Sequence, residues 1–397
     1  MSQKKHLTIL AVAALIFIIA AIVSRPTNND IANAGAKVFP DLFEHANDVT
    51  NIDIQTNNEK LTLSKDKDEW KVAESNNYPA NINRIRNLVL GLSNLKRVEP
   101  KTSNPDNYNR IGVEDVSKKD AKSTQITVYA GKDNKLADII VGQSKPSKAD
   151  PTQKSYYVRT IKDPQSWLVD GSLPSGWQAK DWLDTEILTV NRDRIKQVKV
   201  THQDGSQVFI HRASPDVRDY TLDGLKPGEE INAPYEVNNI ATTFTKMTFD
   251  NVIPQTNSGV SDKPEYTAVL TTFDGLEITY QPYKKDDKHW VKYSARYDEQ
   301  IAKTFQNQQS KQEKVKKPDS PADESKSAAG NESETSPKYK LDTPEQVKQE
   351  VDKYNNRWNN WLYELPEFRV TNIGKSINDL LKKHDKPVLK SKKSSKK

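Results

Sequence analysis

Histidines and carboxylates are the residues of this chain whose chemistry is easiest to evaluate. The six histidines are scattered, and none falls in a His-Glu-x-x-His pattern or another spacing typical of a metal site. His202 and His211 come closest to a pair, because they lie near the two strands of one expected hairpin. We interpret them as surface residues rather than as metal ligands. The sequence therefore predicts neither a metal site nor another cofactor.

Motifs of common hydrolases are not found either. Cysteine is absent, which excludes thiol catalysis, disulfides and a lipoprotein anchor. Glycines fall in turns, such as Gly131 and Gly205, rather than in a Gly-x-Ser-x-Gly elbow or a phosphate-binding loop. Asp53 with Asp66 or Asp68 could act as acid and base, but charged strand edges are common. We expect a protein that is not an enzyme, with a hydrolase as the less favoured alternative.

Aromatic residues gather late in the chain. Tyr354, Trp358 and Trp361 recur close together, followed by Tyr363, and could form a platform for a sugar or a peptide. Aromatic residues at helical spacing more often belong to a core. Packing is therefore the favoured interpretation, and a glycan-binding surface is the alternative.

Lysines dominate the end of the chain. Between Lys382 and Lys397 there are eight lysines and one aspartate. These lysines, among them Lys392, Lys393 and Lys396, have no apolar face between them. The tail is therefore either solvated or bound by simple electrostatics to anionic lipid or a cell-wall polymer, with ~1 kcal/mol from each lysine near a charged surface.

Composition indicates a large folded body. The chain has 397 residues, 34% of them hydrophobic and 29% charged, which is enough for two soluble domains. Its formal net charge of +6 is concentrated in the lysine tail, so the body is close to neutral. A neutral body lacks the basic footprint of a nucleic-acid-binding domain, and we expect no nucleic-acid partner.

An apolar run at residues 7–23 indicates where this body is located. At ~1.5 Å per residue a helix of this length extends roughly 26 Å, close to the ~30 Å hydrocarbon core of a bilayer. Lysines precede the run, so residues 1–6 should stay in the cytoplasm while the chain after the helix is exported. A cleaved signal peptide is the alternative, but the run is long for a signal core and lacks a small-x-small cleavage pattern. We predict a transmembrane helix over residues 7–24, anchored by Leu7, Leu10, Leu15, Phe17, Ile19 and Val23.

Alternating and helical patterns organise the first half of the chain. After a stalk at residues 25–48, alternation of apolar and polar residues predicts antiparallel strands, and apolar residues at helical spacing predict a helix over residues 82–95. The expected strands are residues 51–55, 60–64, 69–72, 125–129, 137–141 and 155–159. Together they predict a first α+β repeat over residues 49–188.

The second half follows the same order, over residues 189–301. Its expected strands are residues 197–200, 207–210, 219–222, 266–270, 276–280 and 290–293. A helix beginning at Ala233-Pro234 carries Val237, Ile240, Phe244 and Met247 on its apolar face. Two copies of this size indicate a duplicated domain rather than a solenoid. We predict an α+β fold: a tandem duplicated domain of antiparallel strands with packing helices, and one N-terminal transmembrane helix.

Three segments follow the second repeat. Residues 302–343 are rich in Gln, Lys, Ser and Glu and should form a disordered insert, because they bury too little apolar surface to fold. Residues 344–382 begin with a good helix start and should form a helical segment that completes the second repeat. Residues 383–397 form the basic tail.

Several motifs together resemble a bacterial envelope family. They are Asn51-Ile52-Asp53-Ile54, Glu69-Trp70-Lys71-Val72, the helix over residues 82–95, Tyr108-Asn109-Arg110-Ile111-Gly112-Val113 and Lys180-Asp181-Trp182-Leu183-Asp184. With the single anchor, they resemble the domain of unknown function DUF4340 over roughly residues 45–300. The resemblance implies an anchored periplasmic protein, and some members are encoded beside or fused to auxiliary parts of ABC transporters of the gliding-motility type. It implies no catalytic residues.

These observations lead to one expectation and one alternative. We expect a single-pass protein of the bacterial inner membrane whose bulk is periplasmic. Its expected partners are the lipid bilayer and the subunits of an ABC-type envelope transporter, for which it would be a non-enzymatic accessory or scaffold protein. The alternative is a cell-wall or glycan binding module that uses the aromatic cluster and the lysine tail.

Overall fold

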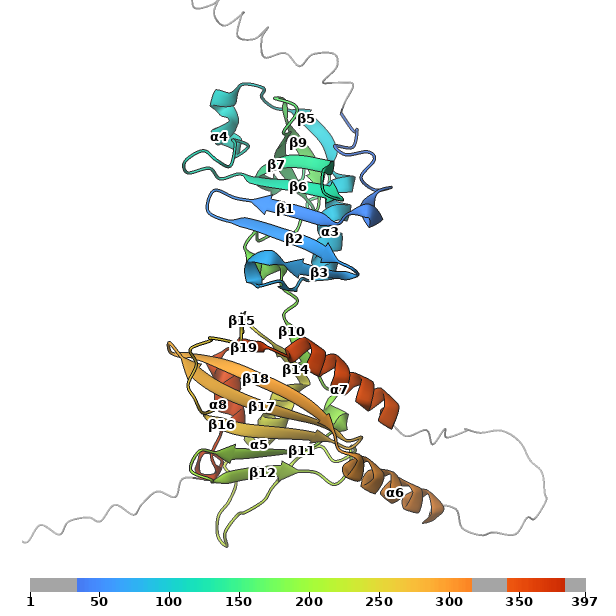
Figure 1. The fold of residues 1–397 in the computed structure, drawn as a ribbon, viewed down its shortest axis with the longest axis vertical. Helices are drawn as coiled ribbons and strands as arrows, with labels where there is room; N and C mark the ends of the chain where they lie inside the picture. Colours follow the sequence, from blue (N-terminus) through green and yellow to red (C-terminus); the bar gives the residue numbers. More distant parts are fainter. Residues whose placement is uncertain (1–33, 316–340, 383–397) are drawn as a thin grey trace, which may run out of the picture. The chain divides into compact units, whose positions relative to one another are not determined.

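The computed structural model describes residues 34–315 and 341–382 (Figure 1). The chain divides into two compact units, Met1–Asp184 and Thr185–Lys397. Both combine antiparallel sheets with helices, so the expected α+β class is confirmed. The predicted anchor at residues 7–24 and the basic tail at residues 383–397 lie outside the described residues. Within the described ranges, no helix has the length and apolar character needed to cross a bilayer.

A nine-stranded antiparallel sheet forms the first unit, in the order β4-β3-β2-β1-β6-β7-β8-β9-β5. Its strands are β1 (Asn51–Gln55), β2 (Lys60–Asp66), β3 (Glu69–Val72), β4 (Tyr78–Pro79), β5 (Lys96–Pro100), β6 (Thr124–Ala130), β7 (Asn134–Pro146), β8 (Lys154–Thr160) and β9 (Ser166–Gly171). The strands expected from alternation are confirmed. β4, β5 and β9 were not predicted as strands.

Period-two alternation explains the core of this sheet. Ile52 on β1 lies opposite Leu63 on β2, and both side chains are buried. One helix, α3 (Ile82–Asn94), covers the sheet, and it begins where the Asn81 side chain accepts a hydrogen bond from the backbone N–H of Arg84 (Figure 1). The apolar residues that α3 buries are Ile85, Leu88, Val89 and Leu92. Each such side chain stabilises the fold by roughly 1.5–3 kcal/mol.

Residues 34–48 correct the prediction of a stalk over residues 25–48. Val38 and Leu42 are buried, with 8% and 2% of their surface exposed. The backbone N–H of Val38 donates to the carbonyl oxygen of Leu95 at 2.9 Å. Burial of these two apolar side chains is favoured over their exposure to water. This part of the predicted stalk therefore belongs to the first unit.

The second unit contains an eight-stranded sheet in the order β13-β12-β11-β16-β17-β18-β19-β15 and a separate pair, β10-β14. Its strands are β10 (Glu186–Thr189), β11 (Ile195–His202), β12 (Gln207–His211), β13 (Thr221–Leu222), β14 (Lys246–Thr248), β15 (Asn251–Pro254), β16 (Tyr266–Thr272), β17 (Leu276–Lys285), β18 (Lys288–Tyr297) and β19 (Trp361–Leu365). Its helices are α5 (Pro234–Thr242), α6 (Glu299–Val315), α7 (Pro344–Trp358), α8 (Glu367–Ile373) and α9 (Ile377–Leu380).

Aromatic rings form a row across the larger sheet. The ring centroids of Tyr266 and Tyr280 are 6.0 Å apart, those of Tyr280 and Tyr293 are 5.4 Å apart, and Tyr363 lies 5.9 Å from Tyr293. These rings come from β16, β17, β18 and β19 in spatial order. Burial raises the pKa of Tyr266, Tyr280 and Tyr293 well above the ordinary value. The row therefore consists of neutral phenols packed as a core.

Two segments of the second unit differ from the predictions: the helix that begins at Ala233-Pro234 and the start of the insert over residues 302–343. α5 ends at Thr242, so Met247 lies on β14 rather than on the face of the helix. The predicted disordered insert begins with helix, because α6 continues to Val315. Ala302 and Phe305 are buried, and the Phe305 ring lies 4.7 Å from that of Phe273. The start of the polar segment therefore packs against the second unit. Residues 316–340 lie outside the described residues.

A strand interrupts the predicted helical segment over residues 344–382. α7 ends at Trp358, and Asn360 adopts a left-handed conformation with φ of 69° that turns the chain. β19 then pairs on both sides, with Tyr363 opposite Val252 on β15 and opposite Val291 on β18. The hydrogen bonds and burial offered by two neighbouring strands outweigh the helical spacing of the aromatic residues.

Candidate functional site

Two glycines bring a loop of the first unit close to its sheet. The loop contains η3 (Pro105–Asn107) and α4 (Tyr108–Ile111), and Gly112 ends α4 with a φ of 70°. The loop then lies against Gly142 on β7, where an added Cβ atom would meet the carbonyl oxygen of Ile111 at 2.4 Å. Only glycine permits this approach. Underneath, Tyr108, Val113 and Ile140 form a small buried cluster.

Arg159 on β8 fastens the loop to the sheet. This residue is buried, and its Nε donates to the carbonyl oxygen of Val113 at 3.2 Å, while Nη2 donates to Asp115 Oδ1 at 2.6 Å. Its guanidinium carbon lies 4.7 Å from the centroid of the Tyr108 ring, a cation–π geometry. The Tyr108 hydroxyl donates to the carbonyl oxygen of Pro164 at 2.6 Å. Both ends of α4 are thereby fixed.

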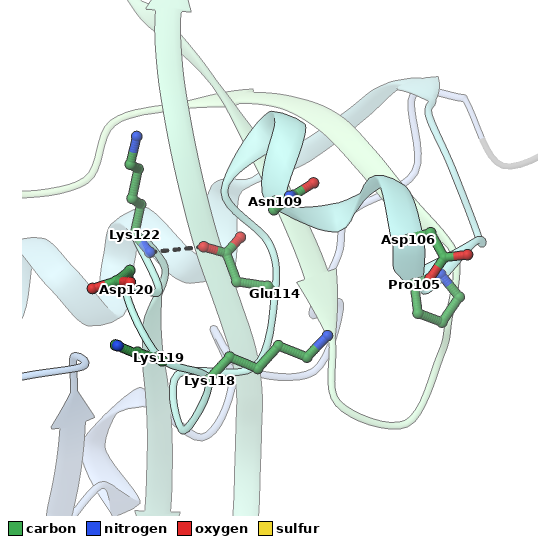
Figure 2. Close-up of a pocket in the computed structure, with 8 residues that line it drawn as sticks. All are labelled: Pro105, Asp106, Asn109, Glu114, Lys118, Lys119, Asp120 and Lys122. Carbon is green, nitrogen blue, oxygen red and sulfur yellow. Dashed lines mark hydrogen bonds between the residues drawn. The ribbon is translucent and has the colours of Figure 1, made fainter.

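A cavity of about 500 Å³ opens beside this loop (Figure 2). Figure 2 shows Glu114 between Asn109 and Lys122, with the Lys118 side chain beneath it and Lys119 on the left. Its lining residues are Pro105, Asp106, Asn109, Glu114, Lys118, Lys119, Asp120 and Lys122. The lining is polar and carries both signs of charge. The volume lies within the range of small-molecule sites, roughly 300–1,000 Å³.

Glu114 is the buried ionisable residue of this cavity, with 4% of its surface exposed. Its Oε1 accepts a hydrogen bond from the backbone N–H of Lys122 at 2.7 Å. Its Oε2 is buried and has no hydrogen-bond partner among the described residues. A buried charged oxygen without a donor costs about 1–3 kcal/mol or more, so such an atom calls for an explanation.

Three lysines supply positive charge to the same cavity. Lys118, Lys119 and Lys122 line it, and no ion pair is found for any of them within residues 34–315 and 341–382. Asp106 and Asp120 contribute negative charge at the rim. This site was not predicted from the sequence. The feature of the sequence that could have indicated the site is Glu114, the acidic residue directly after the motif of residues 108–113.

In the second unit Arg194 is a buried arginine, as Arg159 is in the first. Three carboxylates surround its guanidinium group. It contacts Asp274 at 2.8 Å, Asp342 at 3.1 Å and Glu350 at 2.8 Å. Burial alone would lower the pKa of Arg194, but the hydrogen bond to Glu350 and the charges of Asp274 and Glu350 raise it overall. These contacts tie α7 to the start of β11.

Other buried charges are also satisfied. Arg212 donates to the carbonyl oxygens of Ile195 and Val217, both at 2.8 Å, and Glu277 accepts from Arg296 Nη2 at 2.7 Å. Among the charged side chains that are buried in the described part of the chain, Glu114 alone carries a buried atom without a partner. The half-buried Arg84, Arg97 and Arg192 also have an Nε atom without a partner in the described ranges, so Glu114 differs from them in the burial of the whole residue.

The predicted aromatic site lies in the core. Trp358 is 2% exposed, and its ring stacks on that of Tyr354 with centroids 4.6 Å apart and an interplanar angle of 8°. Trp358 Nε1 donates to the carbonyl oxygen of Ile187 at 3.0 Å. Trp361 lies half-buried on β19. The burial of Trp358 and Tyr354 favours the packing interpretation of these two residues over a sugar platform.

The remaining predicted residues are not brought together. His202 lies at the end of β11 near the hairpin turn, whereas His211 pairs with Gln197 at the other end of the hairpin. His211 Nε2 lies 3.0 Å from Asp223 Oδ1. Lys392, Lys393 and Lys396 lie outside the described residues, as do the anchor residues Leu7, Leu10, Leu15, Phe17, Ile19 and Val23.

Comparison with known proteins identifies one family. The family described as domain of unknown function (DUF4340) matches residues 70–268, about half of the chain. The matched span contains the loop of the first unit with Glu114 and continues into the sheet of the second unit. No curated protein and no solved structure matches the chain.

Proposed function

We propose a scaffold function for this chain, which belongs to the family of the domain of unknown function DUF4340. In this proposal residues 7–24 form a single membrane helix, the N-terminal tail is cytoplasmic, and the two α+β units are periplasmic. The protein is a non-enzymatic accessory subunit of an ABC-type envelope transport complex. It positions or stabilises other subunits and catalyses no step itself.

The observation that supports this proposal is that buried arginines in both units hold surface segments in place. Arg159 fastens a surface loop, Arg194 fastens α7, and Arg212 fastens the segment around Val217. Buried charges contribute little net stability even when they are paired, because desolvation offsets their attraction. They do fix geometry, and a surface that is already ordered loses less entropy when a partner binds. These clusters therefore support a protein that presents firm surfaces to partners.

Duplication of the domain is the second part of the proposal. The order β3-β2-β1-β6-β7-β8-β9-β5 in the first unit has the same pattern as β13-β12-β11-β16-β17-β18-β19-β15 in the second. In each unit a helix, α3 or α5, follows the initial hairpin strands. The two differ between the last long strands: residues 161–165 join β8 to β9, whereas α6, residues 316–340 and α7 separate β18 from β19. This pattern supports an insertion into the second of two copies.

Membrane fractionation combined with protease treatment tests the location. The full-length protein would carry a tag at each end and be expressed in its host. We expect both tags in the inner-membrane fraction after alkaline washing. Protease added to spheroplasts should remove the C-terminal tag and leave a short membrane-protected fragment with the N-terminal tag. A soluble periplasmic product that begins near Ser24, or a C-terminal tag protected in intact spheroplasts, would contradict the proposal.

A further inference from the structure

We propose that the cavity around Glu114 binds a small zwitterion, with a primary ammonium group at Glu114 and a phosphate or carboxylate group at the lysines. Different residues of the cavity would bind the two charged groups of this ligand. The inference concerns the first unit alone and does not depend on the scaffold function.

The ammonium half follows from Glu114. Its Oε1 is already occupied by the backbone N–H of Lys122 at 2.7 Å, which fixes the orientation of the carboxylate. Its Oε2 lacks a donor, while the residue itself is only 4% exposed to solvent. A carboxylate oxygen accepts hydrogen bonds only, so the missing group is an N–H or O–H donor. An ammonium donor also neutralises the buried charge, which a neutral donor does not.

The anionic half follows from the lysines. Lys118, Lys119 and Lys122 are among the residues that line the cavity. Figure 2 shows Lys118 extended beneath Glu114 toward Asp106, whereas Lys119 and Lys122 lie on the other side. Lysines bind phosphate and carboxylate as point charges and adjust their flexible stems to the anion. A ligand whose anion lies a few bonds from its ammonium group therefore fits a site with Glu114 above and Lys118 beneath it.

The rigidity of the loop also favours a specific site. Arg159 holds Val113 and Asp115, the residues on either side of Glu114. The close approach at Gly142 fixes the end of α4. Both residues next to Glu114 are hydrogen-bonded to Arg159, so the backbone at Glu114 is already ordered. Little conformational entropy is therefore lost when a ligand binds.

Binding of defined zwitterions by the full-length protein in detergent tests this inference. Saturation-transfer difference NMR would compare phosphoethanolamine, alanyl-alanine, phosphocholine and ethanolamine. We expect at least one of the two zwitterions with a primary ammonium to bind. Phosphoethanolamine and alanyl-alanine separate a phosphate from a carboxylate as the preferred anion. Phosphocholine, whose quaternary ammonium has no N–H group, and ethanolamine, which has no anion, should bind at least tenfold more weakly.

Glu114→Gln provides the decisive variant. The glutamine oxygen can still accept from the backbone N–H of Lys122, while an amide N–H group replaces Oε2 and repels the ammonium. We expect at least a tenfold loss of zwitterion affinity in a variant that still unfolds cooperatively. Glu59→Gln, in the exposed turn between β1 and β2, is the matched control and should bind like the parent. If Glu114→Gln does not fold, Lys118→Ala replaces it, with the same expected loss.

Two results would overturn the inference. One is that neither primary-ammonium zwitterion binds the parent protein at millimolar concentration, in which case Oε2 is satisfied by water alone. The other is equal binding by the parent, Glu114→Gln and Lys118→Ala, which would place the ligand elsewhere on the protein.

Discussion

The guanidinium group of Arg159 lies against the ring of Tyr108, with the guanidinium carbon 4.7 Å from the ring centroid. This contact joins β8 to α4, which lie far apart in the chain. Arg159 also bonds Val113 and Asp115, on the two sides of Glu114. Arg159 therefore fixes both neighbours of Glu114, the buried carboxylate of the cavity.

Arg159→Met should release this loop while leaving the sheet folded. The substitution keeps apolar bulk but removes both donors, and leaving the buried Val113 carbonyl unpaired costs about 1–3 kcal/mol. We expect amide hydrogen exchange of residues 105–122 to accelerate at least tenfold, with β1 and β2 unchanged. Lys132→Met, in the exposed turn between β6 and β7, is the control. Unchanged exchange in residues 105–122 would show that other contacts hold the loop.

Gly142→Ala tests the close approach between β7 and the end of α4. The new methyl group would sit 2.4 Å from the carbonyl oxygen of Ile111 and 2.5 Å from that of Gly112. Overpacking of this kind costs about 1–3 kcal/mol. Gly131→Ala is the comparison, because no atom lies within 4 Å of the added Cβ and only its φ of 78° opposes the change. Both variants should lose stability, but only Gly142→Ala should accelerate hydrogen exchange in residues 105–122. Equal exchange in the two variants would argue against the contact.

Arg194→Met should destabilise the second unit strongly. It leaves Asp274, whose side chain is 3% exposed, as a buried charge without its cation. Removing one partner of a buried pair typically costs about 3–5 kcal/mol. The exposed pair of Lys303 and Glu299 provides the control, and Lys303→Met should change stability by about 0–1 kcal/mol. Urea unfolding followed by tryptophan fluorescence would measure both, and a similar small loss in the two variants would contradict the importance of Arg194.

Alkaline pH should weaken the second unit in a defined window. Burial raises the pKa of Tyr220 from the ordinary 10.0 to about 12. Between these values the unfolded chain releases a proton that the folded protein keeps, so the stabilising contribution is complete below pH 10 and is lost as pH rises toward 12. The thermal midpoint should fall across this window.

Tyr220→Phe isolates that residue from the other buried tyrosines. The variant loses the hydrogen bond from the hydroxyl to the carbonyl oxygen of Ile195 at 3.0 Å, so it starts about 1 kcal/mol less stable. Its thermal midpoint should then fall less steeply with pH than that of the parent. Tyr235→Phe, at a side chain that is 63% exposed, should keep the parental slope. Identical slopes in the parent and Tyr220→Phe would contradict the assignment.

Elements whose apolar residues follow one clear period could be predicted from sequence, whereas the strand β19 could not. The alternation in β1 and β2 and the apolar stripe of α3 each match one period. In β19, by contrast, Leu362 and Tyr363 are consecutive and both buried, so periodicity does not separate strand from helix. The decision comes from β15 and β18, which pair with β19 from both sides.

The candidate site depends still more on tertiary structure. Glu114 is one acidic residue among many in the sequence, and its burial arises only when Gly112 and Gly142 allow the loop to approach the sheet. Trp358 and Tyr354 show the reverse case. Their spacing fitted both a core and a surface platform, and packing on the second sheet selected the core.

Crosslinking in living cells tests the scaffold function most directly. The tagged full-length protein would be crosslinked, extracted in mild detergent and analysed by mass spectrometry, with an unrelated single-pass periplasmic protein as the control. The account predicts enrichment of the membrane and ATPase subunits of an ABC transporter over that control. Recovery of cell-wall material or envelope-modifying enzymes alone, or of no membrane protein above the control, would contradict it.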